Sequence, residues 1–127
     1  MKLILRYITG ANPEDFPIDL TKNRSQVIGS RGDVKIDYKM ISRRHCQISY
    51  TPENGLFLED LGSRYGTEIK GEPLEERKPK LIYDTSNGSI KFDGIEIKLA
   101  QFPFTLLEDK PSQKLGLLGR LLSMRKT

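Results

Sequence analysis

The sequence is poor in the residues that build disulfides and metal sites. Its 127 residues include one cysteine, Cys46, and one histidine, His45. A single cysteine excludes an internal disulfide and suits a reducing compartment, so we expect a nuclear or cytoplasmic protein. One cysteine and one histidine cannot supply the set of four such ligands that a zinc site normally takes. We therefore predict no bound metal and no cofactor.

Long apolar runs are also missing. No stretch approaches the roughly 20 apolar residues that cross a bilayer. At the N-terminus, Leu3, Ile4 and Leu5 are followed at once by Arg6, which is too short an apolar region for a secretory signal. We expect no membrane partner for the body of the chain. A Gly-Lys-Ser/Thr loop of the nucleotide-binding kind is absent as well.

The net charge of +4 is unevenly distributed. Residues 110–127 carry five basic and no acidic residues, which leaves residues 1–109 at −1, with 16 basic and 17 acidic residues. A body so close to neutral disfavours a general nucleic-acid surface. Five cations nevertheless lie within fourteen positions that hold only two acids: Arg31, Lys35, Lys39, Arg43 and Arg44. Such a run is usually a solvent-exposed face, and it indicates a binding surface only if the fold brings its side chains together at one place.

The apolar residues of the body follow the pattern of strands. They occur in short runs that turn residues interrupt about every 8–12 positions, which is typical of a β-sandwich. Cys46, Ile48 and Tyr50 alternate with polar neighbours, as in a half-buried strand. Asn54-Gly55 then predicts a hairpin turn, followed by a return strand over 56–61. We predict one all-β domain over residues 1–109, with about eleven strands and no long helix.

Residues 110–127 show a helical pattern instead. From Ser112, a suitable N-cap, the apolar side chains cover about half of a helical wheel at about 100° per residue. Two interior glycines, Gly116 and Gly119, each cost about 1 kcal/mol relative to alanine, so the helix needs a partner for its apolar face. We predict a short basic amphipathic tail helix that folds back on the sandwich, docks on a partner protein or lies on an anionic membrane surface.

The residues able to perform catalysis do not form a catalytic pattern. Cys46 and His45 are neighbours, and consecutive residues of a strand point to opposite faces, so they cannot pair as nucleophile and base. The alternation places Cys46 in the core. The acidic pairs Glu59-Asp60 and Glu75-Glu76 have no matching partner elsewhere, and we interpret them as surface charges. We predict no enzymatic activity and no small-molecule substrate.

Two motifs hold groups that suit a phosphate. One is Ser42-Arg43-Arg44-His45, ahead of a strand, and the other is Gly62-Ser63-Arg64-Tyr65-Gly66-Thr67, a tight turn between strands. At this separation they resemble the hallmarks of the forkhead-associated (FHA) domain family, over residues 3–104. The resemblance implies an eleven-stranded β-sandwich whose loops, at one end, bind phosphothreonine on a partner protein. Guanidinium and hydroxyl donors suit the three acceptor oxygens and the charge near −2 of that group.

The resemblance also implies the role of individual residues. Ser42 and Arg43 should contact the phosphate directly, while His45 supports their loop from beneath. The predicted phosphopeptide-binding residues are Arg31, Ser42, Arg43, Arg64 and Tyr65. The predicted supporting residues are Gly29, His45, Gly66 and Thr67.

The sequence departs from the family pattern at two positions. Gly29 is followed by Ser30, so that Arg31 stands one position later than the usual arginine. Tyr65 replaces an asparagine that holds the peptide backbone in the family, and a phenol offers fewer hydrogen bonds than an amide. The Tyr65-Gly66-Thr67 turn is similar to that of the FHA domain of nibrin, a DNA double-strand-break repair protein. This favours the nucleus and a role in DNA-damage or other kinase signalling.

Two other hypotheses stand beside phosphothreonine recognition. In the first, the chain is a degenerate FHA-fold scaffold that makes phosphate-independent contacts with proteins. In the second, which the charge of the body disfavours, the tail and the cations between Arg31 and Arg44 bind nucleic acid.

Overall fold

The computed structural model describes residues 1–7, 13–84 and 94–109, which form eleven β-strands. They are β1 (Lys2–Tyr7), β2 (Glu14–Asp19), β3 (Ser25–Gly29), β4 (Val34–Lys35), β5 (Cys46–Thr51), β6 (Gly55–Asp60), β7 (Thr67–Ile69), β8 (Glu72–Pro73), β9 (Lys80–Tyr83), β10 (Ile95–Leu99) and β11 (Phe102–Glu108). Within those ranges no helix is long and apolar enough to span a bilayer. The predicted all-β fold with about eleven strands is confirmed.

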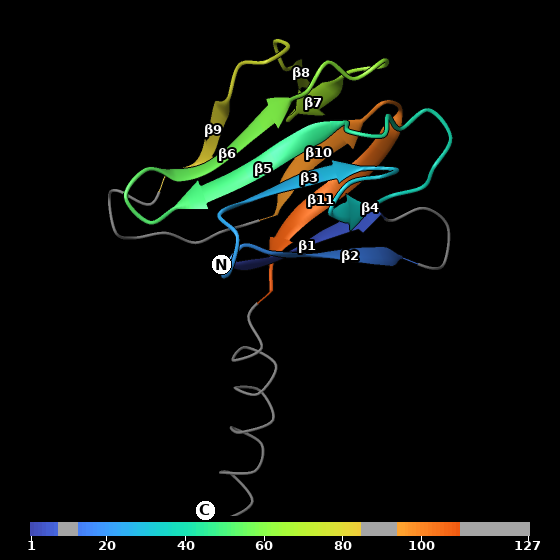
Figure 1. Ribbon diagram of the computed structural model, residues 1–127. Coiled ribbons are helices and arrows are strands. Elements are labelled where there is room, and N and C mark those ends of the chain that lie inside the picture. Colours follow the sequence, from blue (N-terminus) through green and yellow to red (C-terminus); the bar gives the residue numbers. More distant parts are fainter. Residues whose placement is uncertain (8–12, 85–93, 110–127) are drawn as a thin grey trace, which may run out of the picture.

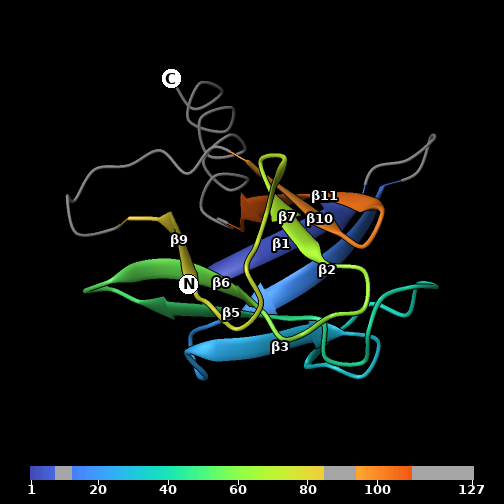
Figure 2. The ribbon, with the colours of Figure 1, turned by 90° about the horizontal axis from the view of Figure 1, so that it is seen from above.

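The strands form two sheets that stack as the layers of a sandwich (Figures 1 and 2). The six-stranded sheet has the order β2-β1-β11-β10-β7-β8, and the five-stranded sheet has the order β4-β3-β5-β6-β9. Neighbouring strands are antiparallel in both sheets, except that β3 and β4 run parallel. The chain passes repeatedly from one layer to the other, so the inner faces of both sheets build one core.

The period-two pattern of the sequence determines which side chains enter this core. In β10, Ile95, Ile97 and Leu99 are buried, whereas Glu96 and Lys98 between them are exposed. The opposite layer supplies its own buried residues, including Ile48, Leu56 and Leu58. Burying one such aliphatic side chain contributes about 1.5–3 kcal/mol. Cys46 is also fully buried, as predicted, and its burial raises the pKa of the thiol.

One local detail, the β5–β6 hairpin, differs from expectation. Gly55 is already the first residue of β6 and pairs with Thr51, so the hairpin loop consists of residues 52–54 rather than of Asn54-Gly55 alone. β2 contains Pro17, which an edge strand tolerates because one side of its backbone needs no partner. The tail helix predicted over 110–127 lies outside the described residues.

An aromatic cluster anchors the long β4–β5 loop on the six-stranded sheet. The ring of Tyr38 stacks on Phe104, with an interplanar angle of 16°, and meets the edges of Phe102 and Tyr7 at centroid distances of 5.2 and 5.3 Å. The Tyr38 hydroxyl donates a hydrogen bond to Glu14 of β2. This packing ties the base of the β4–β5 loop to the opposite sheet at one end of the sandwich.

Candidate functional site

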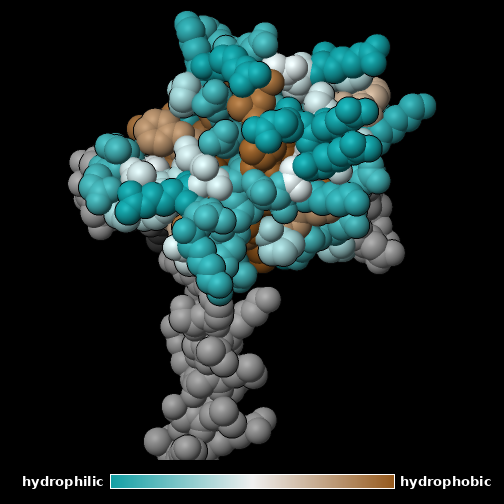
Figure 3. Space-filling model, viewed as in Figure 1, coloured by the Kyte–Doolittle hydropathy of each residue, from teal (hydrophilic) through white to brown (hydrophobic). Residues whose placement is uncertain are grey.

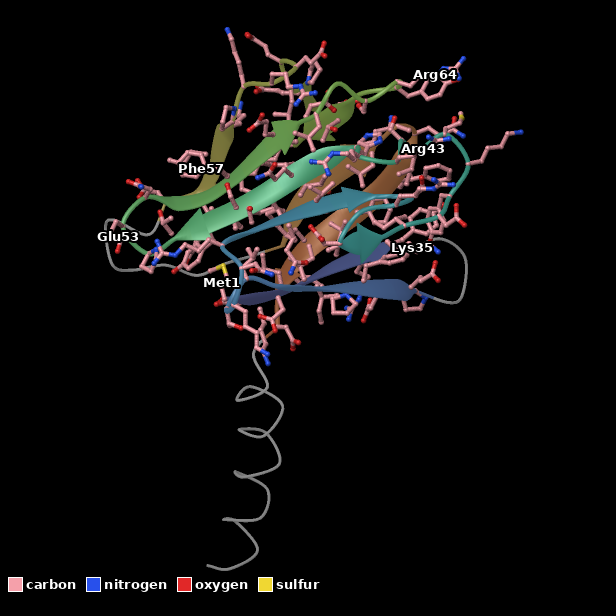
Figure 4. The ribbon with its side chains drawn as sticks, in the orientation of Figure 1. Met1, Lys35, Arg43, Glu53, Phe57 and Arg64 are labelled. Carbon is pink, nitrogen blue, oxygen red and sulfur yellow. The ribbon has the colours of Figure 1, made fainter. Side chains whose placement is uncertain are left out.

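Three connections meet at that end of the sandwich: residues 30–33 between β3 and β4, residues 36–45 between β4 and β5, and residues 61–66 between β6 and β7. Backbone hydrogen bonds join the first two, because the Ser30 and Arg31 N–H groups donate to the carbonyls of Ser42 and Arg43 at 3.0 and 3.1 Å. Figure 4 shows Arg43 and Arg64 on the same side of the molecule, opposite Met1 and Glu53. Folding therefore gathers both sequence motifs at one place.

Gly29 permits the close approach of the first two connections. A Cβ atom at this position would lie 2.2 Å from the Arg43 carbonyl oxygen and 2.7 Å from that of Ser42. Real Cβ atoms do not come so close to backbone atoms, so any side chain would push the Ser42–Arg43 segment outward. Only glycine fits here.

His45 joins the second and third connections from below. Its ring is fully buried, and Nδ1 accepts the N–H of Ser42 at 3.1 Å, while Nε2 lies 2.8 Å from the Gly66 carbonyl oxygen. Since Nδ1 accepts, Nε2 carries the proton and donates it to Gly66. Burial lowers the pKa of His45 and favours this neutral form.

The hydroxyl of Ser42 is oriented by the third connection. Its Oγ accepts the backbone N–H of Arg64 at 3.0 Å. A hydroxyl has two lone pairs and one proton, so this bond uses a lone pair and keeps the proton available for an acceptor outside the loop. The arrangement turns Ser42 into a donor toward the open side of the site.

Asp60, at the end of β6, holds the third connection in its shape. Its carboxylate accepts four hydrogen bonds: from the N–H groups of Gly62 and Ser63, each at 3.1 Å, and from the hydroxyls of Ser63 and Thr67, at 2.6 and 2.7 Å. Ser63 Oγ in turn accepts the N–H of Gly66 at 3.0 Å. The carboxyl group of a turn-initiating aspartate commonly binds backbone N–H groups in this way.

The interpretation of Asp60 as a surface charge is therefore wrong. Asp60 is only 4% exposed, and its neighbour Glu59 is half-buried. The carboxylate is tolerated inside because charge-assisted hydrogen bonds replace its hydration. The spacing Asp60-x-x-Ser63 ahead of a glycine was the available signal for such a turn, and sequence reasoning missed it.

The three connections border an open pocket of about 410 Å³. Its lining combines cations, hydroxyls and apolar groups: Ser30, Lys39, Met40, Ile41, Ser42, Arg43, Arg64 and Tyr65. Tyr65 is 52% exposed, and its ring faces the Arg64 guanidinium at 5.5 Å, so it forms one wall and leaves the pocket open. The pocket offers an anion two guanidinium groups, one ammonium group and an oriented hydroxyl.

Met40 occupies an unusual conformation within this lining. Its φ is +78°, and the Ile41 N–H donates to the Tyr38 carbonyl at 3.1 Å, which closes a turn with Met40 as its third residue. A positive φ at this place of a turn normally calls for glycine or asparagine. Sequence reasoning had no signal for this strained residue, nor for the place of Lys39 in the pocket.

The predicted residues divide into three groups by position. Ser42, Arg43, Arg64 and Tyr65 line the pocket, whereas Gly29, His45, Gly66 and Thr67 lie behind it. Arg31 does not line the pocket, although its backbone is bonded to that of Arg43. The ligand-binding roles of these residues remain predictions.

Comparison with known families identifies the domain. Residues 24–90, which include both motifs, match the model of the FHA domain. The chain belongs to the FHA domain family. No protein with a curated description matches the sequence of this FHA domain.

Solved FHA domains share the fold at low sequence identity. The FHA domain of CT664 protein from Chlamydia trachomatis superposes with a TM-score of 0.63 and 23% identity, over 87% of this chain and 100% of that chain. The N-terminal FHA domain of S. cerevisiae Rad53p, solved in complex with a phosphothreonine peptide, has a TM-score of 0.63 and 17% identity, over 86% and 94% of the two chains. The FhaA FHA domain, complexed with the intracellular domain of Rv3910, has a TM-score of 0.57 and 20% identity, over 82% and 98%.

Proposed function

We propose that this FHA domain binds phosphothreonine on a partner protein through the pocket at the end of the sandwich, and that it works as a non-catalytic recognition module. The observation that carries the proposal is the orientation of Ser42. Its Oγ accepts the Arg64 N–H, so its own proton is available to a phosphate oxygen beside the guanidinium groups of Arg43 and Arg64.

The chemistry of the pocket matches a phosphate dianion. A phosphothreonine has a charge near −2 and three strong acceptor oxygens, which rigid guanidinium donors satisfy well. A hydrogen bond to a charged group contributes about 1.5–3 kcal/mol, so one arginine and one serine supply a substantial part of a micromolar affinity. His45, Gly29 and Asp60 pre-organise the donors, which lowers the cost of ordering them when the ligand arrives.

Ligands of related structures support the same conclusion. The Rad53p FHA domain of the same fold was solved with a phosphothreonine peptide, and the FhaA FHA domain with a protein partner. Arg31 belongs to this proposal as a residue that reaches the phosphate, or its flank, from the neighbouring connection. Tyr65 belongs to it as an aromatic wall against the peptide backbone.

The cellular setting is part of the proposal. A single cysteine and the FHA family favour the nucleus or cytoplasm, and the Tyr65-Gly66-Thr67 turn favours nuclear DNA-damage or other kinase signalling. Imaging of a fluorescent fusion, before and after DNA damage, tests this setting. A signal confined to another compartment would contradict it.

Binding of matched peptides tests the proposed function. Fluorescence anisotropy should show binding of a threonine-phosphorylated peptide library and little binding of the unphosphorylated library. Arg43→Ala should weaken binding by about ten- to a hundredfold and Ser42→Ala by less, whereas Arg24→Ala, an exposed arginine away from the pocket, should have no effect. Equal binding of both libraries would favour a phosphate-independent scaffold instead. The position of Arg31 outside the pocket lining is the observation that fits this second candidate function.

A further inference from the structure

The end of the sandwich that carries the pocket holds more positive charge than one phosphate neutralises. Residues 30–45 and 61–66, called here the site end, contain six cations: Arg31, Lys35, Lys39, Arg43, Arg44 and Arg64. All six are exposed, and among the described residues none of them forms an ion pair. Two acids, Asp33 and Asp37, belong to the site end, so its own residues carry +4. Two carboxylates outside these ranges also border it: Asp60 accepts the Gly62 and Ser63 N–H groups, and Glu14 accepts the Tyr38 hydroxyl.

Folding concentrates this charge instead of spreading it. The Arg31 N–H donates a hydrogen bond to the Arg43 carbonyl. Lys35 of β4 pairs with Gly29 of β3, which packs against that carbonyl. Figure 4 shows Arg64, Arg43 and Lys35 along one side of the molecule, and Figure 3 shows that side covered by hydrophilic side chains. The Asp33 carboxylate accepts the Val27 N–H at 2.9 Å, which ties it to the base of its loop.

The remainder of the body has the opposite sign. Outside the site end, residues 1–109 hold ten basic and fifteen acidic residues, a net charge of −5. The molecule thus has one strongly positive end on an acidic body. Like charges held together repel each other unless a ligand compensates them, so the pattern favours an anionic partner at this end alone.

The positions of the cations indicate where additional negative charge would bind. Lys39, Arg43 and Arg64 line the pocket, while Arg31, Lys35 and Arg44 lie outside its lining. A phosphothreonine near −2 would leave the site end at about +2. The cations outside the pocket are then available to groups that flank the phosphate.

Resting on the proposed function, we infer that the phosphothreonine bound by this domain lies among further anionic side chains, either carboxylates or a second phosphate. Lys35 and Arg44 contact these flanking groups and set the sequence preference of the domain. A nucleic-acid duplex suits the site end less well, because its charge of one per about 1.7 Å continues past the patch and would face the acidic body.

Five fluorescent peptides test the inference with the full chain. They share one threonine site and differ as follows: phosphothreonine with neutral flanks, with Asp/Glu flanks, with a flanking phosphoserine, with Lys flanks, and unphosphorylated threonine with neutral flanks. At about 0.05 M salt, both anionic-flank peptides should bind about tenfold more tightly than the neutral-flank phosphopeptide, and the Lys-flank peptide should bind more weakly. The preference should shrink to about threefold or less at about 0.5 M salt, because exposed charges are screened. The tighter of the two anionic peptides identifies the source of the charge.

Two double variants assign the preference to the site end. Lys35→Gln/Arg44→Gln should reduce the tenfold preference to about threefold or less. Lys22→Gln/Arg24→Gln removes the same charges in the β2–β3 connection and should keep the preference. Equal affinity for neutral and anionic flanks, an undiminished preference in Lys35→Gln/Arg44→Gln, or tighter salt-sensitive binding of duplex DNA would overturn the inference. None of these results bears on phosphothreonine binding itself. That proposal fails if the neutral-flank peptide binds equally well with and without its phosphate.

Discussion

The substitution Asp60→Asn tests most directly whether the Asp60 carboxylate holds residues 61–66 in the shape that the site needs. The side chains have the same shape, but the amide has one acceptor oxygen where the carboxylate has two. Each carboxylate oxygen of Asp60 accepts two hydrogen bonds, so Asp60→Asn leaves two donors facing an NH₂ group. Thr67 is buried, and water cannot reach its hydroxyl to replace a lost bond.

The expected loss of stability follows from these contacts. A hydrogen bond to a charged group contributes about 1.5–3 kcal/mol, and a buried donor left without a partner costs about 1–3 kcal/mol. Since the two hydroxyls can rotate and recover part of the loss, we expect Asp60→Asn to lower the free energy of unfolding by about 2–4 kcal/mol. This is a large fraction of the about 5–15 kcal/mol that is usual for a domain.

Urea unfolding, followed by circular dichroism, measures the change. Glu59→Gln is the matched control, because it removes a charge from the adjacent, half-buried position and should change the stability by less than about 0.5 kcal/mol. Phosphopeptide affinity should also fall in Asp60→Asn, because the turn that positions the Arg64 N–H loosens. An Asp60→Asn variant as stable as Glu59→Gln would refute the role of Asp60 as the anchor of this turn.

Two further predictions concern the groups beneath the pocket. Burial lowers the pKa of His45, so the stability that the neutral imidazole contributes is fully present above about pH 6.5, the ordinary pKa, and is lost as the pH falls through the lowered pKa. The chain has no other histidine, so His45→Asn should remove this part of the pH dependence of urea unfolding. An unchanged pH profile in the variant would contradict this role of His45. Gly29→Ala places a Cβ against the Arg43 carbonyl and should lower the stability by about 1–3 kcal/mol, as overpacking usually does, together with the phosphopeptide affinity. Thermal unfolding measures the first effect and fluorescence anisotropy the second. Unaltered values would mean that the Ser42–Arg43 segment moves aside freely.

The sequence alone determined the fold class and the two motifs of the site. Strand alternation is a local property, so Cys46 and Ile48 in β5, and the apolar residues of β10, could be assigned to the core before their partners were known. Polar groups that are close in sequence could also be recognised from the sequence, since Ser42, Arg43 and His45 lie within four positions. A phosphate-binding hypothesis could rest on them because such donors suit one kind of ligand.

Only the tertiary structure decided which side chains face the pocket. The bond from the Arg64 N–H to Ser42 spans 22 positions, and that of His45 to Gly66 spans 21, so neither follows from a local pattern. The same holds for Asp60, whose burial depends on a turn that folds back over the strand end, and for Arg31, which stands one position later than in the family and does not line the pocket. The physical reason is that an exposed and a buried polar residue at a strand end have the same sequence signature. Their difference arises only when distant segments enclose one of them and supply its hydrogen bonds.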